Sequence, residues 1–190
     1  VDSWILYNEP DICNPSNPGY AWNSPNRAVD YLHYAQAAYA GVKSVSPSAD
    51  VILGSLGITD SSCQSNGDEM TFWNQMLGAL GGAPLPADEV SLNIHKEPEK
   101  IYDLVKRYHE SMQAHGFDKS LWIMEMGIPV QPDPIDPAQN GNLAVDKDNQ
   151  ESFLIQAYAN AIAGGADHIG VYKMSDFPAN DPAFATIKTA

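Results

Sequence analysis

The segment WILYNEP, residues 4–10, joins a short apolar run to a polar turn, and this pattern recurs along the chain. The four apolar residues predict a strand, and Asn8-Glu9-Pro10 predicts the turn that ends it. After a loop, Ser24 and Pro25 predict the N-cap and first turn of a helix whose apolar positions continue to Val45. These residues form one strand-loop-helix unit.

The same order of strand, loop and helix continues to the end of the chain without an internal sequence repeat. Strands that alternate with helices of this length require right-handed crossovers and a parallel sheet covered by helices. The sequence therefore predicts the α/β class, but its periodicity fits both a barrel and an open doubly wound sheet. We expect strands at 4–7, 51–56, 90–94, 121–124 and 169–172, and helices at about 24–45, 69–80, 98–115 and 150–163.

Polar residues at the strand ends favour the barrel. Glu9, His95 and Glu125 each follow the apolar run of their strand, where barrel enzymes place catalytic groups. No glycine-rich phosphate loop follows a strand, which disfavours a nucleotide-binding open sheet. With 190 residues, the chain is shorter than the roughly 250 of a complete (β/α) barrel, so we expect a single partial barrel over residues 1–190.

Composition excludes several other classes of function. The chain has 24 Asp and Glu against 10 Lys and Arg, a net charge of −14, so nucleic acid is not an expected partner. The same charge disfavours encounter with anionic polysaccharides. No apolar run is long enough to span a bilayer, so we expect a soluble protein with no membrane partner.

The two cysteines, Cys13 and Cys63, lack the spacing of a zinc site. Both lie in loops that follow predicted strands, so they would lie on one face if those strands are neighbours. A disulfide, which would imply an oxidising compartment, and two free thiols both remain open.

Two glutamates at the carboxyl ends of parallel strands would face the same mouth of the sheet, among Trp and Tyr side chains. Cleavage of a glycosidic bond with retention needs one protonated carboxylic acid for the leaving oxygen and one carboxylate as nucleophile. Their environments must differ to hold the two pKa values apart. Glu9 and Glu125 are the candidates for this pair.

The segments around these glutamates resemble a known family. Residues 4–10, WILYNEP, resemble the strand-four Asn-Glu-Pro segment of the retaining (β/α)-barrel glycoside hydrolases, the clan of cellulases, mannanases, xylanases, β-glucosidases and β-xylosidases. Residues 122–127, WIMEMG, resemble its strand-seven segment. The resemblance implies that the chain holds strands four to eight, that Glu9 is the acid/base and that Glu125 is the nucleophile.

The resemblance also implies residues that bind substrate. By position, Asn8 would bond the sugar 2-hydroxyl, and His95 matches a frequent active-site histidine. Trp22 could stack on a sugar ring. Tyr172 or Lys173 would take the place where the family often has a tryptophan, while Glu97 stands where it often has an aromatic residue. These two departures bear on substrate identity more than on reaction type.

The remaining polar residues have simpler interpretations. Acidic loop residues, including Asp11, are expected to be solvated charges rather than metal ligands. His33, His109, His115 and His168 are expected on helices or in adjacent turns, in solvated or packing roles. No metal or cofactor is expected.

The sequence thus predicts a retaining glycosidase that acts on a β-linked glycan or glycoside, with a carbohydrate as partner. Strands one to three and an arginine that the family often places near the nucleophile are missing. We expect that the chain was cut from a longer secreted protein; completion by another chain, as a missing N-terminal half-barrel, and an unusual partial barrel are the alternatives. A noncatalytic carbohydrate-binding barrel and an inactive fragment are the functional alternatives.

Overall fold

The computed structural model describes residues 2–12, 24, 26–57, 70–128 and 147–172. These residues form an α/β fold in which strands and helices alternate along the chain, as the sequence predicts. The strands are β1 Ser3–Asn8, β2 Asp50–Leu56, β3 Glu89–Ile94, β4 Leu121–Met126 and β5 His168–Val171, and the helices are α1 Arg27–Val45, α2 Thr71–Leu80, α3 Pro98–Ala114 and α4 Lys147–Gly164.

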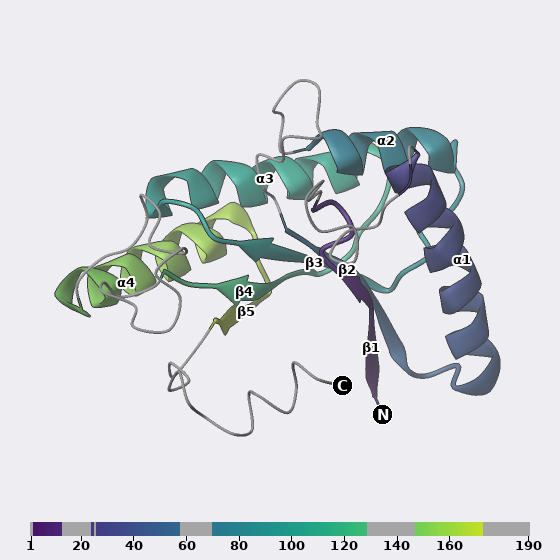
Figure 1. Ribbon diagram of the computed structural model, residues 1–190, viewed down its shortest axis with the longest axis horizontal. Coiled ribbons are helices and arrows are strands. Elements are labelled where there is room, and N and C mark those ends of the chain that lie inside the picture. The colour runs from purple at the N-terminus through teal and green to yellow at the C-terminus, as the bar shows by residue number, and fades with distance from the viewer. Residues whose placement is uncertain (1, 13–23, 25, 58–69, 129–146, 173–190) are drawn as a thin grey trace.

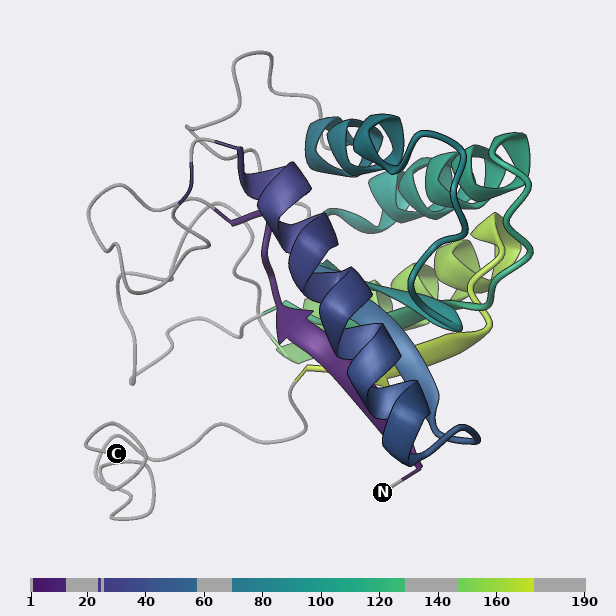
Figure 2. The same cartoon turned by 90° about the vertical axis from the view of Figure 1, so that its right-hand side faces the viewer.

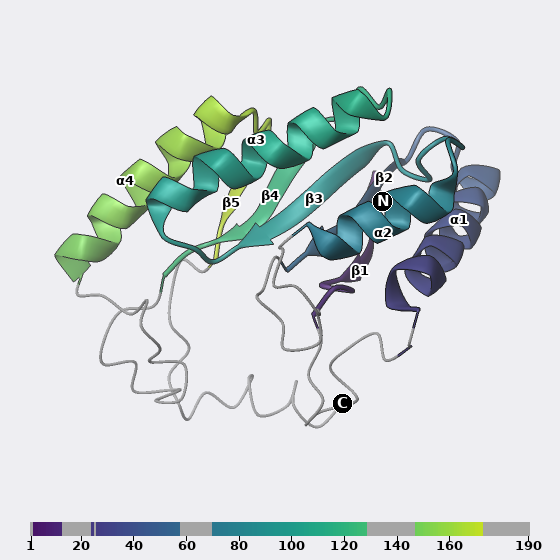
Figure 3. The same ribbon diagram turned by 90° about the horizontal axis from the view of Figure 1, so that it is seen from above.

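The five strands form one parallel sheet in the order β1-β2-β3-β4-β5. The four helices cover one side of this sheet, with α1 next to α2 and α3 next to α4 (Figures 1, 2 and 3). A doubly wound sheet has helices on both faces and a point where the strand order reverses. Within the described residues, neither feature is present, and the arrangement is that of an arc of consecutive β/α units.

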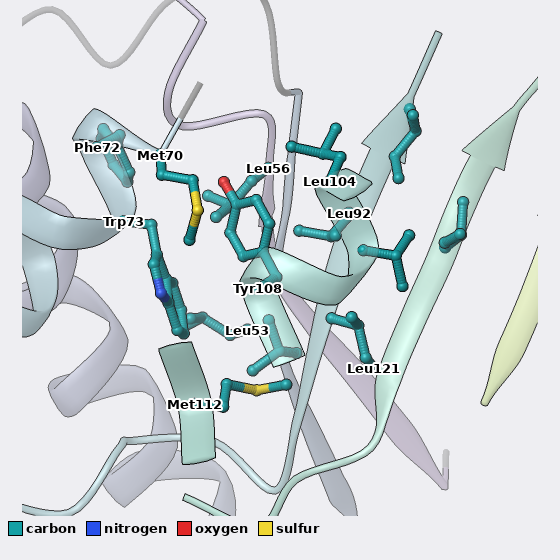
Figure 4. Packing of buried hydrophobic residues seen from close by; sticks show 14 of the residues in the cluster. Leu53, Leu56, Met70, Phe72, Trp73, Leu92, Leu104, Tyr108, Met112 and Leu121 are labelled. Carbon is teal, nitrogen blue, oxygen red and sulfur yellow. The ribbon is translucent and has the colours of Figure 1, made fainter. Parts of the chain in front are cut away.

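The core lies between the sheet and the helices (Figure 4). Trp73 of α2 and Tyr108 of α3 are fully buried, with ring centroids 5.6 Å apart, and pack over Leu53 and Leu92 of the sheet. The indole N–H of Trp73 donates to the hydroxyl of Ser111 at 2.9 Å, so this large ring is buried with its polar atom satisfied. One contiguous apolar cluster therefore fixes α2 and α3 on the sheet.

Helix α1 is tied to the first two strands by one buried hydroxyl. The Oη of Tyr31 accepts the backbone N–H of Gly54 at 2.7 Å and donates to the carbonyl of Leu6 at 2.8 Å. A Cβ atom at position 54 would lie 2.2 Å from that carbonyl oxygen, so only glycine permits this approach. The contact fixes β1, and Glu9, the first candidate catalytic residue, follows this strand directly.

The side of the sheet away from the apolar cluster carries buried polar groups near the carboxyl ends of the strands. The hydroxyls of Ser55 and Ser91 are 3.1 Å apart, and Asn93 lies further along β3. The strand register shifts between Leu53 and Leu56 and again opposite residues 92 and 93. Such irregularities re-aim side chains and are frequent beside active sites.

Two local predictions differ from the structure. Helix α1 begins at Arg27, with Asn26 rather than Ser24 at its N-cap; the Ser24 hydroxyl accepts the N–H of Asn26 at 3.1 Å and donates to the carboxylate of Asp30 in the first turn. His168, expected on a helix or in a turn, lies in β5 and stacks on Trp122 with centroids 4.0 Å apart. Its interpretation as a packing residue still fits.

The first strand is incompletely covered. Trp4, Ile5 and Tyr7 of β1 are 47%, 43% and 39% exposed, and β1 pairs only with β2 among the described strands. Exposed apolar residues on an edge strand are a surface that proteins usually cover. No described helix combines the length and apolar character needed to cross a membrane.

Candidate active site

The carboxyl ends of β1, β3 and β4 bring four of the sequence-predicted site residues together. Asn8 ends β1 and Glu9 follows it, His95 follows β3, and Glu125 lies one residue before the end of β4. Because the strands are parallel, these ends meet at one edge of the sheet. Glu125 was expected just after its strand; a longer β4 includes it, and the register shift places it opposite Asn93.

The backbone around Glu9 adopts an unusual conformation. Tyr7 and Glu9 have φ angles of 73° and 52°, in the left-handed region that non-glycine residues rarely adopt. Each such residue costs roughly 1–3 kcal/mol and persists only where its surroundings fix it. Here the N–H of Glu9 donates to the carbonyl of Ser55 at 2.8 Å. The turn therefore holds Glu9 against β2 rather than in a flexible loop.

Asn93, a residue that the sequence interpretation treated only as part of a strand, joins this turn from β3. Its Nδ2 lies 3.1 Å from Glu9 Oε1 and 3.2 Å from Asn8 Oδ1. The side chain is fully buried. A possible signal in the sequence was the polar pair Ser91 and Asn93, two residues apart in an otherwise apolar strand, which places both on one face.

Glu125 is paired with His95. The Nε2 of His95 lies 3.5 Å from Glu125 Oε2, and the Nδ1 lies 3.3 Å from the carbonyl oxygen of Gly127. Because a carbonyl only accepts, Nδ1 carries a hydrogen. With only that hydrogen, Nε2 is an acceptor and would face an acceptor oxygen of Glu125. A favourable contact therefore requires a second hydrogen, carried either by Nε2 or by the carboxyl group of Glu125.

The electrostatics of the two glutamates are linked. Partial burial raises the pKa of Glu125 above its ordinary value of 4.5, the negative charge of Glu9 raises it further, and His95 acts in the opposite direction. The two carboxyl groups are therefore near enough to influence each other across three strand spacings of the sheet. A pair of carboxyl groups with unequal environments is what acid/base chemistry requires.

Tyr172 borders the same site from the end of β5. Its ring makes an edge contact with His95, with centroids 5.9 Å apart, and the residue is 51% exposed. The backbone N–H of Tyr172 donates to the carbonyl of Met126 at 3.0 Å, which holds it beside β4. An exposed aromatic ring is therefore anchored next to His95. Two other predicted site residues, Trp22 and Lys173, and the cysteines Cys13 and Cys63 lie outside the described residues.

Two other residues near the site have local structural roles. Asp11 is buried rather than solvated, because its Oδ1 accepts the N–H of Gly57 at 2.7 Å and its charge faces Arg27. Glu97 precedes α3 and pairs with Lys100 at 3.0 Å, one turn along the helix. Among the residues that the structure describes, no group of three or more His, Cys, Asp or Glu could hold a metal ion.

Comparison with known proteins shows which solved structures share this fold. No protein-family model matches the chain, and no curated protein matches its sequence. Among solved structures, a glucosidase from Croceicoccus marinus aligns with a TM-score of 0.61 and 14% identity, over 89% of this chain and 31% of that enzyme. The chain shares a fold found in glycoside hydrolases.

Two further structures support the same conclusion. A GH2 β-galacturonidase from Eisenbergiella tayi aligns with a TM-score of 0.55 and 16% identity, over 97% of this chain and 28% of its own. A GH128 endo-β-1,3-glucanase from Sorangium cellulosum aligns with a TM-score of 0.51 and 16% identity, over 90% of this chain and 58% of its own. This chain thus spans between about a quarter and three-fifths of these enzymes, and at such identities the likeness concerns the glycosidase fold alone.

Proposed function

We propose that this chain carries the catalytic half of a retaining glycoside hydrolase for β-linked glycans or glycosides. The observation that carries the proposal is the meeting of Glu9 and Glu125 at one edge of a glycosidase-like sheet, where the charge of one raises the pKa of the other. Glu9 is the acid/base and Glu125 the nucleophile, and no metal or cofactor is needed.

The reaction proceeds in two displacements. Protonated Glu9 donates its proton to the glycosidic oxygen while the Glu125 carboxylate attacks the anomeric carbon, which releases the aglycone as an alcohol and leaves a glycosyl ester on Glu125. Glu9, now ionised, removes a proton from water, and that water attacks the anomeric carbon. The sugar leaves, Glu125 is again a carboxylate, and Glu9 is again protonated.

The raised pKa of Glu125 is compatible with its role as nucleophile, because part of the rise comes from the charge on Glu9. In the reactive state Glu9 is protonated, so this repulsion is absent and Glu125 ionises more readily. His95, when it carries a proton on Nε2, further favours the carboxylate at 3.5 Å. A protonated Glu9 therefore favours an ionised Glu125, and these are the two protonation states that the reaction needs.

The substrate would be held by residues around this pair. Asn8 would bond the hydroxyl next to the anomeric carbon, His95 and Tyr172 would border the sugar, and Trp22 and Lys173 are further substrate-binding candidates. The net charge of −14 favours a neutral glycan, because an acidic polysaccharide would be repelled. Nucleic acid and membranes are not proposed partners, and secretion is the proposed location.

The chain would form the last five β/α units of a (β/α)-barrel, completed by protein beyond this sequence. Support comes from the consecutive strand order, the helices on one side of the sheet, and the exposed apolar residues of the edge strand β1. In this arrangement the uncovered side of the sheet is the barrel interior, where the polar residues Ser55, Ser91 and Asn93 lie.

Trapping of the covalent intermediate tests the proposal. A 2-deoxy-2-fluoro β-glycoside with an activated leaving group should label the chain once, and peptide mass spectrometry should place the label on Glu125. Glu125→Ala should lose at least about 10⁴-fold in turnover of aryl β-glycosides, whereas Glu9→Ala should retain kcat/KM for activated substrates only, because the first displacement then needs no acid. Glu151→Ala, an exposed position on α4, is the control and should leave both unchanged.

The other outcomes separate the alternatives. A label on Glu9 would mean that Glu9 is the nucleophile and Glu125 the acid/base. Glycan binding that survives Glu125→Ala in a chain without turnover would indicate a carbohydrate-binding barrel instead. A chain that neither binds glycans nor unfolds cooperatively would be an inactive fragment.

A further inference from the structure

The carboxamide of Asn93 contacts both members of the Asn8-Glu9 pair with a single nitrogen. We propose that Asn93 is a positioning residue: it determines which oxygen of Glu9 carries the catalytic proton and which way the Asn8 amide faces. This inference rests on the proposed function and deepens it.

The orientation of the Asn93 amide follows from its neighbours. Glu9 Oε1 and Asn8 Oδ1 are both acceptors, and Asn93 presents the NH₂ group, with two hydrogens, to both. The reversed amide would place an oxygen against two oxygens. The hydrogen-bond network therefore selects one amide orientation.

The hydrogen bond from Asn93 gives the two carboxyl oxygens of Glu9 different roles. Because Oε1 accepts a hydrogen from Asn93, an O–H on that oxygen would compete with the amide hydrogen for the same space. In the acid form the proton is therefore on Oε2. Asn93 thereby directs proton donation to the oxygen that it does not contact.

The same amide orients Asn8. Its Oδ1 is occupied by Asn93, so its own NH₂ group is directed away from β3. Asn8 is exposed at the mouth of the sheet, so that NH₂ can donate to a substrate hydroxyl. Without Asn93, the Asn8 amide could rotate and present oxygen and nitrogen with equal ease.

Asn93 is suited to this role because it is held firmly. It is fully buried in the central strand β3, and its backbone pairs in register with Glu125 of β4. Its Oδ1 is buried and accepts no hydrogen bond from the described residues. Burial of an unsatisfied acceptor is costly, so selection for stability alone would favour an apolar residue here.

Leaving-group dependence tests the proposal in the full chain. Asn93→Leu keeps the approximate shape and removes both donated hydrogen bonds. We expect kcat/KM for an aryl β-glycoside with a poor leaving group to fall about 10–100-fold, and for one with a good leaving group to fall less than about 3-fold, because only the former needs proton donation. Ser91→Ala, a buried polar change two residues earlier on β3, should affect both substrates equally.

Equal losses on both substrates in Asn93→Leu would overturn the positioning role and indicate a general structural defect. If that variant does not fold, Asn93→Ala removes the donor without adding a charge, and the same selective loss is expected. A chain that turns over neither substrate contradicts the proposed function rather than this inference.

A second measurement does not depend on activity. The side-chain N–H resonances of Asn93 in a ¹H–¹⁵N spectrum should move with pH as the Glu9 carboxyl group titrates, because a hydrogen bond transmits that change. Glu9→Gln should abolish this movement. A response that persists in Glu9→Gln would show that Asn93 does not report on Glu9, and the proposal would be wrong.

Discussion

Glu9 and Glu125 illustrate how the same side chain is given different properties by different neighbours. Glu9 is held by a strained turn and by the Asn93 amide, whereas the carboxylate of Glu125 lies 3.5 Å from the Nε2 of His95. Burial and the charge of Glu9 raise the pKa of Glu125, so the folded protein favours its neutral form.

That raised pKa makes stability depend on pH. Between the ordinary value of 4.5 and the higher folded value, the native state binds more protons than the unfolded state, so stability falls as pH rises through this window. Glu125→Gln removes the effect. We expect it to raise stability at pH 7 by up to about 1 kcal/mol, or roughly 2–4 °C in Tm, and to have little effect below pH 4.

The comparison of melting curves at pH 4 and pH 7 has an internal control. The pKa of Glu89 is also raised, by burial and by Asp50, so Glu89→Gln should show the same sign. In a Glu9→Gln background, the stability gain from Glu125→Gln should shrink and the gain from Glu89→Gln should not, because the charge of Glu9 acts on Glu125 and not on Glu89. A Glu125→Gln variant less stable than wild type at pH 7 would contradict the raised pKa.

At the level of residues, polar site residues that follow a strand are easier to predict from the sequence than polar site residues that lie within one. Glu9, His95 and Glu125 interrupt apolar runs and are therefore visible in the sequence. Asn93 was missed because a single amide in a strand resembles any half-buried position. Its partners, Asn8 and Glu9, precede it by 85 and 84 positions in the sequence. Buried Asp11 was missed because its partner, the N–H of Gly57, lies 46 positions away in the sequence.

At the level of elements, apolar periodicity predicts every strand and helix of the described chain to within a few residues. The errors lie where tertiary contacts decide. Val45 was expected on the apolar face of α1 but is 87% exposed, because it is the last residue of that helix, beyond Val42, which still packs against the core. The register shifts in β2 and β4 have no signature in hydrophobic pattern.

A matched pair of glycines tests the packing of these elements. In Gly54→Ala the new Cβ would meet two backbone carbonyl oxygens, at 2.2 and 2.4 Å, and the Tyr31 hydroxyl at 2.8 Å. Because none of these atoms can move without separating β1 from β2, we expect a loss of roughly 2–4 kcal/mol. In Gly78→Ala, on α2, no atom lies within 4 Å, and a gain of about 0.5–1 kcal/mol is expected from helix propensity.

Urea unfolding of both variants measures the difference. If Gly54→Ala is as stable as wild type, β1 is not held by the close contact with β2 and Tyr31 that the structure has. Glu9 follows β1 directly, so the site would then be less rigid than its geometry indicates.

At the level of the whole molecule, periodicity could not decide between a barrel and a doubly wound sheet. The two differ in which side of the sheet each crossover takes and in strand order, and neither quantity is encoded in local hydrophobic pattern. The structure supplies both: consecutive strands and helices on one side. It also reveals exposed apolar residues on the edge strand β1.

This exposed edge predicts self-association of the chain at high concentration. Two molecules can each cover Trp4, Ile5 and Tyr7 of the other, because an edge strand with apolar side chains is a pairing surface. Ile5→Lys should weaken this association about tenfold or more, since burial of one isoleucine side chain contributes roughly 1.5–3 kcal/mol.

Sedimentation velocity over a concentration series measures the effect, and Val45→Lys provides the matched control at an exposed position at the end of α1. Both substitutions reduce the net charge of −14 by one unit, a change that by itself lowers repulsion and favours association. A decrease confined to Ile5→Lys must therefore come from β1. Equal behaviour of the two variants would mean that the edge strand is not the contact, and the need for further protein to cover it would lose its support.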